Sequence, residues 1–138
     1  MRYVVLATHG KMAEGLKHTI EWILGPRPSL SAYSVENDLE GISAALKQFF
    51  YGLETSDQVL VFTDISQGST TQLFYPYLNT HQMHLIAGGN LALILSLMLY
   101  PDEQPLTEAQ IREEIQMARA HMHYVNDSEI IINEADEL

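Results

Sequence analysis

The sequence places a histidine and an aspartate, two side chains able to do proton-transfer or nucleophilic chemistry, directly after two predicted β-strands. His9 follows the apolar residues 3–7, and Asp64 follows residues 58–63. Each run is typical of a buried parallel strand. The carboxyl ends of parallel strands meet at one edge of a sheet, where ligands bind. We therefore expect His9 and Asp64 to come within hydrogen-bond reach.

A carboxylate that accepts a hydrogen bond from one ring nitrogen of histidine fixes the tautomer and makes the other nitrogen a better nucleophile. It also stabilises the cation that forms when that nitrogen is substituted. Asp64 would therefore orient the imidazole of His9 and leave Nε2 as the attacking atom. Two plainer interpretations stay open. His9 could be a structural histidine at a strand end, and Asp64 could cap the helix that follows.

Small and hydroxyl-bearing residues lie in a turn-rich segment after the third predicted strand. The backbone N–H groups and hydroxyls of Gly68, Ser69 and Thr70 would lie at a helix amino terminus, which is a ready site for an anion. Thr8 and Gly10, on either side of the histidine, are predicted to bind the same phosphate. A histidine, a carboxylate that orients it and an anion cradle together describe a phosphoryl acceptor.

Other kinds of chemistry find little support in the sequence. There is no cysteine, which excludes disulfides and thiolate chemistry. The glycines form neither a dinucleotide-binding fingerprint nor a Walker loop, and no Gly-x-Ser-x-Gly elbow is present. The spacing of the remaining histidines does not suit a metal site. These are His18, His81, His84, His121 and His123. We expect neither a metal nor a cofactor.

The composition indicates one soluble domain with an acidic surface. The chain has 138 residues, and 18 acidic against 7 basic residues give a formal net charge of −11. This charge argues against nucleic acid and anionic membranes as partners, and favours a basic protein partner. The longest apolar stretch, residues 91–100, is about half of what a bilayer requires. A cytoplasmic protein without direct membrane insertion is therefore expected.

Hydrophobic periodicity predicts alternating strands and helices. Such a βαβαβαβα pattern predicts an α/β fold, with a doubly wound, mainly parallel four-stranded sheet and helices on both faces. The predicted strands are residues 3–7, 31–35, 58–63 and 83–87, and the predicted helices are residues 11–24, 39–51, 70–78, 91–100 and 107–123.

Three segments resemble one known family, the enzyme IIA components of the mannose family of the bacterial sugar phosphotransferase system (PTS). Residues 5–16 (VLATHGKMAEGL) are similar to the opening of those proteins. Residues 62–69 (FTDISQGS) are similar to their Asp-x-x-Gly-Gly-Ser-Pro loop, although Gln67 replaces the first Gly and Thr70 replaces the Pro. Residues 86–91 (IAGGNL) are similar to their Gly-x-Asn segment. The resemblance extends to about residue 124.

The resemblance implies a phosphotransferase in which His9 is the phosphorylated residue and Asp64 holds its imidazole. His9 would accept phosphate from the phosphocarrier protein HPr and pass it to an enzyme IIB partner for sugar uptake, within a complex that includes membrane components. The resemblance also implies a homodimer that exchanges a C-terminal antiparallel strand, for which residues 128–133 are the candidate. The chain would divide into a IIA domain, residues 1–124, and a C-terminal strand with an acidic tail, residues 125–138.

Two other functions remain open for the same residues. The first is the phosphoryl-donor subunit of a bacterial dihydroxyacetone kinase, which uses a similar domain and the same histidine chemistry. The second is a non-catalytic regulatory module that binds a ligand in the crevice. Covalent phosphorylation of His9 separates the carriers from the binding module.

Overall fold

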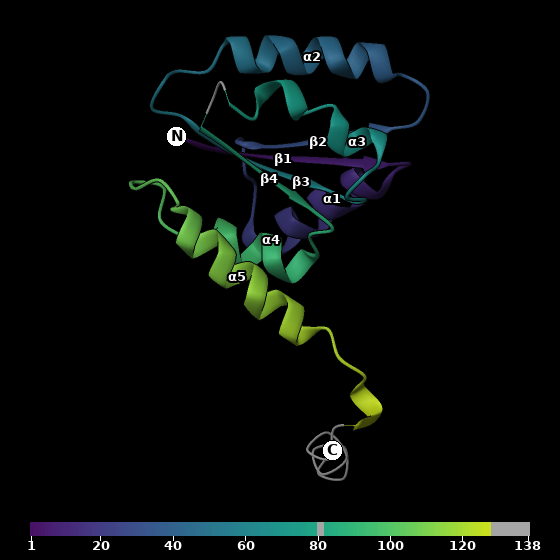
Figure 1. Ribbon diagram of the computed structural model, residues 1–138, viewed down its shortest axis with the longest axis vertical. Coiled ribbons are helices and arrows are strands. Elements are labelled where there is room, and N and C mark those ends of the chain that lie inside the picture. Colours follow the sequence, from purple (N-terminus) through teal and green to yellow (C-terminus); the bar gives the residue numbers. More distant parts are fainter. Residues whose placement is uncertain (80–81, 128–138) are drawn as a thin grey trace.

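The computed structural model describes residues 1–79 and 82–127, which contain a sheet of four parallel strands (Figure 1). These are β1 (Arg2–His9), β2 (Leu30–Val35), β3 (Gln58–Thr63) and β4 (Gln82–Ala87). The strand order is β2-β1-β3-β4, so the direction of winding reverses between β1 and β3. Such a reversal opens a crevice at the carboxyl ends of the two strands. The predicted α/β class and four-stranded parallel sheet are confirmed.

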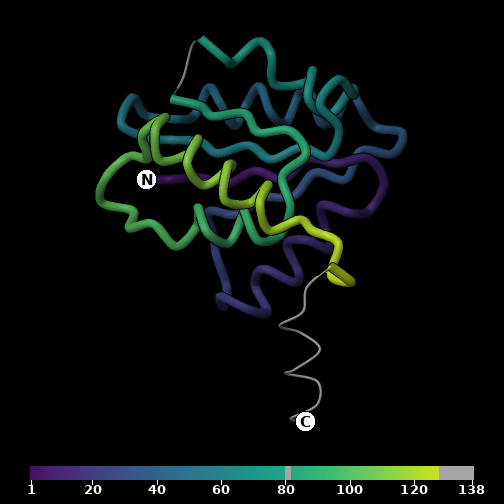
Figure 2. Tube along the Cα trace, turned by 60° about the horizontal axis from the view of Figure 1, so that its bottom comes forward, coloured from purple at the N-terminus to yellow at the C-terminus, as the bar shows by residue number. Residues whose placement is uncertain are grey.

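Helices cover both faces of the sheet (Figure 1). One face carries α1 (Met12–Leu24), α4 (Leu91–Met98) and α5 (Glu108–His121). The other carries α2 (Leu39–Tyr51), the short α3 (Ser69–Gln72) and the 3₁₀ helix η1 (Tyr75–Tyr77). Figure 2 shows α5 as the last long element, followed by the 3₁₀ helix η2 (Val125–Asp127).

The two central strands hold the core together because their side chains alternate between two hydrophobic layers. Val4 and Leu6 of β1 pack under α1 and α4, whereas Val5 and Ala7 pack under α2. Every residue of β3 is buried. His9 is the first exposed residue after the buried run of β1, so the core fixes its backbone and leaves its ring at the surface.

Local sequence determines where the helices begin and end. The Asp38 carboxylate accepts the N–H of Gly41 at 3.1 Å and caps α2, whose bounds match the predicted 39–51. Thr107 and Gln110 form the predicted capping box at the start of α5. Gly25 ends α1 with a φ of +83°, a conformation that favours glycine. The ends of α4 and α5 each fall two residues before the predicted ones.

The predicted helix over residues 70–78 is wrong, because the structure divides this segment into α3 and η1. Pro76 explains the break. It has no N–H to donate to the carbonyl of Gln72, so the α-helical hydrogen-bond pattern stops and the chain continues as the 3₁₀ helix η1. The predicted C-terminal strand, residues 128–133, lies outside the described residues.

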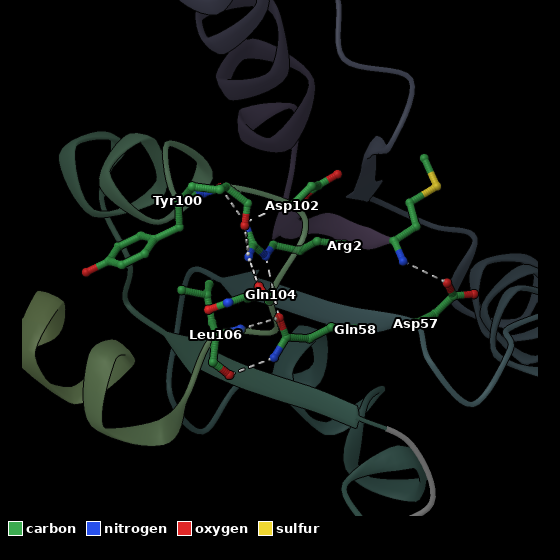
Figure 3. Close-up of polar contacts among 9 residues, drawn as sticks. Arg2, Asp57, Gln58, Tyr100, Asp102, Gln104 and Leu106 are labelled. Atoms are coloured by element: carbon green, nitrogen blue, oxygen red, sulfur yellow. Dashed lines mark hydrogen bonds and ion pairs between the residues drawn. The ribbon is translucent and has the colours of Figure 1, made fainter.

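A buried arginine organises the edge of the sheet opposite the crevice (Figure 3). The side chain of Arg2 is 4% exposed. It donates to three backbone carbonyls of the loop between α4 and α5, those of Tyr100, Pro101 and Gln104. The Gln58 amide accepts the N–H of Leu106 and donates to its carbonyl. These contacts fix the loop that leads into α5.

In the described part of the chain, no helix is long and apolar enough to cross a membrane.

Candidate functional site

His9 and Asp64 meet at the carboxyl edge of the sheet, where the direction of winding reverses. His9 ends β1 and Asp64 directly follows β3. The distance from His9 Nδ1 to Asp64 Oδ2 is 2.9 Å, and the backbone N–H of His9 donates to the same oxygen at 2.9 Å. The histidine side chain is 43% exposed, and the aspartate side chain is 14% exposed. The contact expected from the sequence is therefore present.

The second oxygen of Asp64 is equally well satisfied. Its Oδ1 accepts the N–H of Ile65 at 3.0 Å and the hydroxyl of Thr70 at 2.8 Å. Burial by itself would raise the pKa of this carboxyl group. The hydrogen bonds from His9, from Thr70 and from the loop backbone outweigh burial and lower the pKa to about 2. Asp64 is therefore ionised at neutral pH.

The ionised carboxylate determines which ring nitrogen of His9 carries the proton. A carboxylate only accepts hydrogen bonds, so Nδ1 must donate and Nε2 of the neutral ring keeps its lone pair. The hydroxyl of Ser69 lies 3.3 Å from Nε2 and can donate to it. The site thus presents a nucleophilic nitrogen on an exposed ring, with a hydroxyl donor beside it.

Two glycines shape the backbone around the imidazole. The φ of Gly68, −82°, suits any residue, but a Cβ there would lie 3.0 Å from His9 Cε1, so a larger residue would displace the imidazole by a few tenths of an ångström. Gly10 has a φ of +59° and turns the chain from β1 toward α1. Its N–H donates to the carbonyl of Val35 at 3.0 Å. Gly68 backs the ring, whereas Gly10 shapes the turn.

The residues predicted to bind phosphate fall into two groups. Ser69 is exposed and contacts the ring. Thr8 and Thr70 are buried, and their hydroxyls have protein partners. Thr8 Oγ1 accepts the N–H of Ala13 at 2.7 Å and caps the start of α1, and Thr70 donates to Asp64. The assignment of phosphate contacts to these residues stays a prediction.

The sequence analysis did not identify the hydroxyls of Thr63 and Thr71, which together close the loop after β3. The Thr71 hydroxyl donates to the carbonyl of Ile65 at 2.6 Å, and Thr63 Oγ1 lies 2.6 Å from Thr71 Oγ1. Because Thr71 gives its only hydroxyl proton to Ile65, Thr63 must donate to Thr71. Threonines on both sides of a turn were the available indication of such a closure.

Residues 88–90, which directly follow β4, lie at the same edge of the sheet but line a different hollow. This hollow of about 250 Å³ lies between β4, α4 and α5, with Arg119 and Met122 in its lining. The Asn90 side chain accepts the N–H of Leu93 and caps α4. Within residues 1–79 and 82–127, no three histidine or acidic side chains form a cluster able to hold a metal ion.

Comparisons with known proteins find a matching family and several similar solved structures. Residues 3–116 match the family described as EIIA-man, PTS system fructose IIA component. Among curated proteins, no sequence matches the chain. A crystal structure from Klebsiella pneumoniae, described as a phosphoenolpyruvate-dependent sugar PTS permease, is 30% identical, with a TM-score of 0.79 over 91% of both chains.

Two further solved structures share the fold at lower identity. One is a PTS IIA protein associated with the fucose utilization operon of Streptococcus pneumoniae, with 21% identity and a TM-score of 0.77 over 91% of this chain and 94% of that one. The other is the mannose/sorbose-specific IIA subunit from Enterococcus faecalis, with 21% identity and a TM-score of 0.74 over 89% and 93%. By its matched length and its identity to the Klebsiella protein, the chain belongs to the mannose/fructose IIA family (EIIA-man) of the sugar phosphotransferase system.

Proposed function

We propose that this protein is a phosphoryl carrier that accepts a phosphoryl group from phospho-HPr on His9 and passes it to an enzyme IIB partner for sugar uptake. The observation that carries the proposal is the 2.9 Å contact between Nδ1 of His9 and the ionised Asp64. This contact leaves Nε2 unprotonated on a ring that is 43% exposed. Family membership makes phosphoryl transfer the expected use of such a nitrogen.

The transfer step is a substitution at phosphorus. The Nε2 lone pair of His9 forms the new N–P bond while the N–P bond of the donor breaks, and the donor nitrogen recovers its electron pair. His9 keeps its Nδ1 proton, so its ring becomes positively charged as the bond forms. The Asp64 carboxylate stabilises this charge, and transfer to the next partner reverses the step.

The start of α3 supplies donors for the phosphoryl oxygens. The first N–H groups of a helix have no acceptor within the helix. In α3 the first of these belongs to Ser69, the exposed residue whose hydroxyl lies 3.3 Å from Nε2. Such donors place negative oxygens without any proton transfer, so positioning and charge stabilisation supply the catalysis.

The proposal includes the assembly in which the carrier works. With a net charge of −11, the chain favours docking proteins that present basic surfaces, by electrostatic steering. We assign HPr and an enzyme IIB component to this role. The carrier would be a cytoplasmic homodimer.

Intact mass measured after incubation with phosphoenolpyruvate, enzyme I and HPr tests the proposal. Wild type should gain the mass of one acid-labile phosphoryl group, and His9→Ala should gain none. His18→Ala, which removes another exposed histidine, is the matched control and should behave as wild type. Unmodified wild type beside active enzyme I and HPr, or a labelled His9→Ala, would refute it.

A second step of the same experiment identifies the acceptor. The phosphorylated protein is mixed with an enzyme IIB component, or with the nucleotide-binding subunit of a dihydroxyacetone kinase. Loss of the label to IIB supports the proposal. Loss of the label only to the kinase subunit would instead identify the chain as the phosphoryl-donor subunit of a dihydroxyacetone kinase.

A further inference from the structure

We propose that Thr70 is a positioning residue for His9, because its buried hydroxyl fixes the Asp64 carboxylate in the orientation that directs Oδ2 at the imidazole. This inference deepens the proposed function and rests on it for its consequence in phosphoryl transfer. It assigns Thr70 an action through Asp64 rather than a contact with the phosphoryl group.

The hydrogen bonds of Asp64 show why one more donor matters. An ionised carboxylate offers about four acceptor positions. Oδ2 takes two donors from His9, and Oδ1 takes the N–H of Ile65 and the hydroxyl of Thr70. Rotation of the carboxylate about Cβ–Cγ would break the Thr70 contact and move Oδ2 away from Nδ1. The hydroxyl therefore resists this rotation.

The burial of Thr70 separates its role from that of its neighbour. Thr70 is 0% exposed, so an incoming phosphoryl group cannot reach its hydroxyl from solvent. Ser69, the preceding residue, is exposed and lies 3.3 Å from Nε2. The first turn of α3 therefore acts on both sides of the imidazole, directly on Nε2 and through Asp64 on Nδ1.

Thr71 provides a matched control in the same turn. It is 4% exposed, and its hydroxyl closes the loop by hydrogen bonds to Ile65 and Thr63 rather than to the carboxylate. Removing the Thr71 hydroxyl disturbs the loop, whereas removing the Thr70 hydroxyl disturbs the loop and the carboxylate. A difference between the two variants isolates the effect on Asp64.

The experiment compares Thr70→Val, Thr70→Ala, Thr70→Ser and Thr71→Val by three measurements. Histidine ¹⁵N NMR of the unphosphorylated protein reports the tautomer of His9, and ¹³C NMR reports the titration of Asp64. Quench-flow measurement of the reaction with phospho-HPr reports the transfer rate. Thr70→Ser and Thr70→Ala differ by one oxygen atom, so this pair still isolates the hydroxyl if Thr70→Val does not fold.

In Thr70→Val and Thr70→Ala, the Nε2–H tautomer of His9 should gain population and the pKa of Asp64 should rise from about 2 toward its usual value. Transfer should slow about tenfold, the effect of one hydrogen bond to a charged group. Thr70→Ser should restore all three measurements. Thr71→Val should leave the tautomer and the Asp64 titration unchanged, with less slowing.

Equal slowing in Thr70→Val and Thr71→Val, with an unchanged His9 tautomer in both, would overturn the inference. So would a Thr70→Ser variant that matches Thr70→Ala. The NMR measurements need no phosphoryl donor, so failure of the proposed function can be distinguished from failure of this inference. A wild-type protein that is never phosphorylated, with the tautomer change present in Thr70→Ala, refutes the carrier function and supports the positioning of the imidazole.

Discussion

Replacing Asp64 by Asn tests the charge at the centre of the site through protein stability. The pKa of Asp64 is lowered from 3.8 to about 2, because its hydrogen bonds outweigh the effect of burial. A lowered pKa in the folded state stabilises the fold by about 1.4 kcal/mol per unit, so the ionised carboxylate contributes about 2 kcal/mol at neutral pH. Asn keeps the shape but loses this charge. Its NH₂ group would also face hydrogen-bond donors at a position where a carboxylate oxygen of Asp64 accepts their hydrogen bonds.

The sign of the pH dependence follows from the direction of the pKa change. The contribution of Asp64 is fully present well above pH 3.8 and is lost as the pH falls through about 2. At pH 3 about 1 kcal/mol should remain. Asp64→Asn should therefore cost at least about 2 kcal/mol at pH 7, and this cost should shrink by about 1 kcal/mol at pH 3.

Urea unfolding of wild type and Asp64→Asn at several pH values between 7 and 3 measures this difference. Asp38→Asn is the control, because Asn caps a helix as well as Asp and the loss of one charge there should cost less than about 1 kcal/mol. A cost for Asp64→Asn that is the same at every pH, or smaller than that of the control at pH 7, would refute the account of the Asp64 carboxylate.

Two further substitutions separate the site from the scaffold. Gly68→Ala should slow phosphoryl transfer about tenfold, because the new Cβ would lie 3.0 Å from the imidazole of His9. The free energy of unfolding should change by less than about 1 kcal/mol, because the backbone conformation of residue 68 suits alanine. Quench-flow measures the rate and urea unfolding the stability, and an unchanged rate would contradict this prediction. Arg2→Met should cost about 3 kcal/mol, because three carbonyls lose their buried donor. Its His9 should still be phosphorylated at the wild-type rate in the folded fraction, and slow labelling there would show that the two edges of the sheet are coupled.

The parts of the site that could be predicted are those determined by strand topology. Buried apolar runs end at His9 and just before Asp64, and parallel strands bring such ends together. The meeting of these two residues therefore followed from the two apolar runs and the parallel topology that they predict. The capping of α2 and α5 followed from local residue types in the same way.

What could not be predicted depends on loop geometry at the level of single hydrogen bonds. The sequence shows Thr8 and Thr70 as hydroxyls near an anion site, and only the structure shows that both are buried against protein partners. The break of the helix at Pro76 was open to prediction, since the ring removes a donor that a continuous helix needs. The role of Gly68 depends on the position of the His9 ring across the loop, which no local pattern contains.

The measurement that tests the central claim most directly is ¹⁵N NMR of the protein with labelled histidine, after phosphorylation through enzyme I and HPr. The structure predicts one phosphorylated ring, that of His9, with phosphorus bonded to Nε2 and a proton retained on Nδ1 toward Asp64. Phosphorus on Nδ1 would contradict the orienting role of Asp64. A phosphorylated ring other than His9 would contradict the site itself.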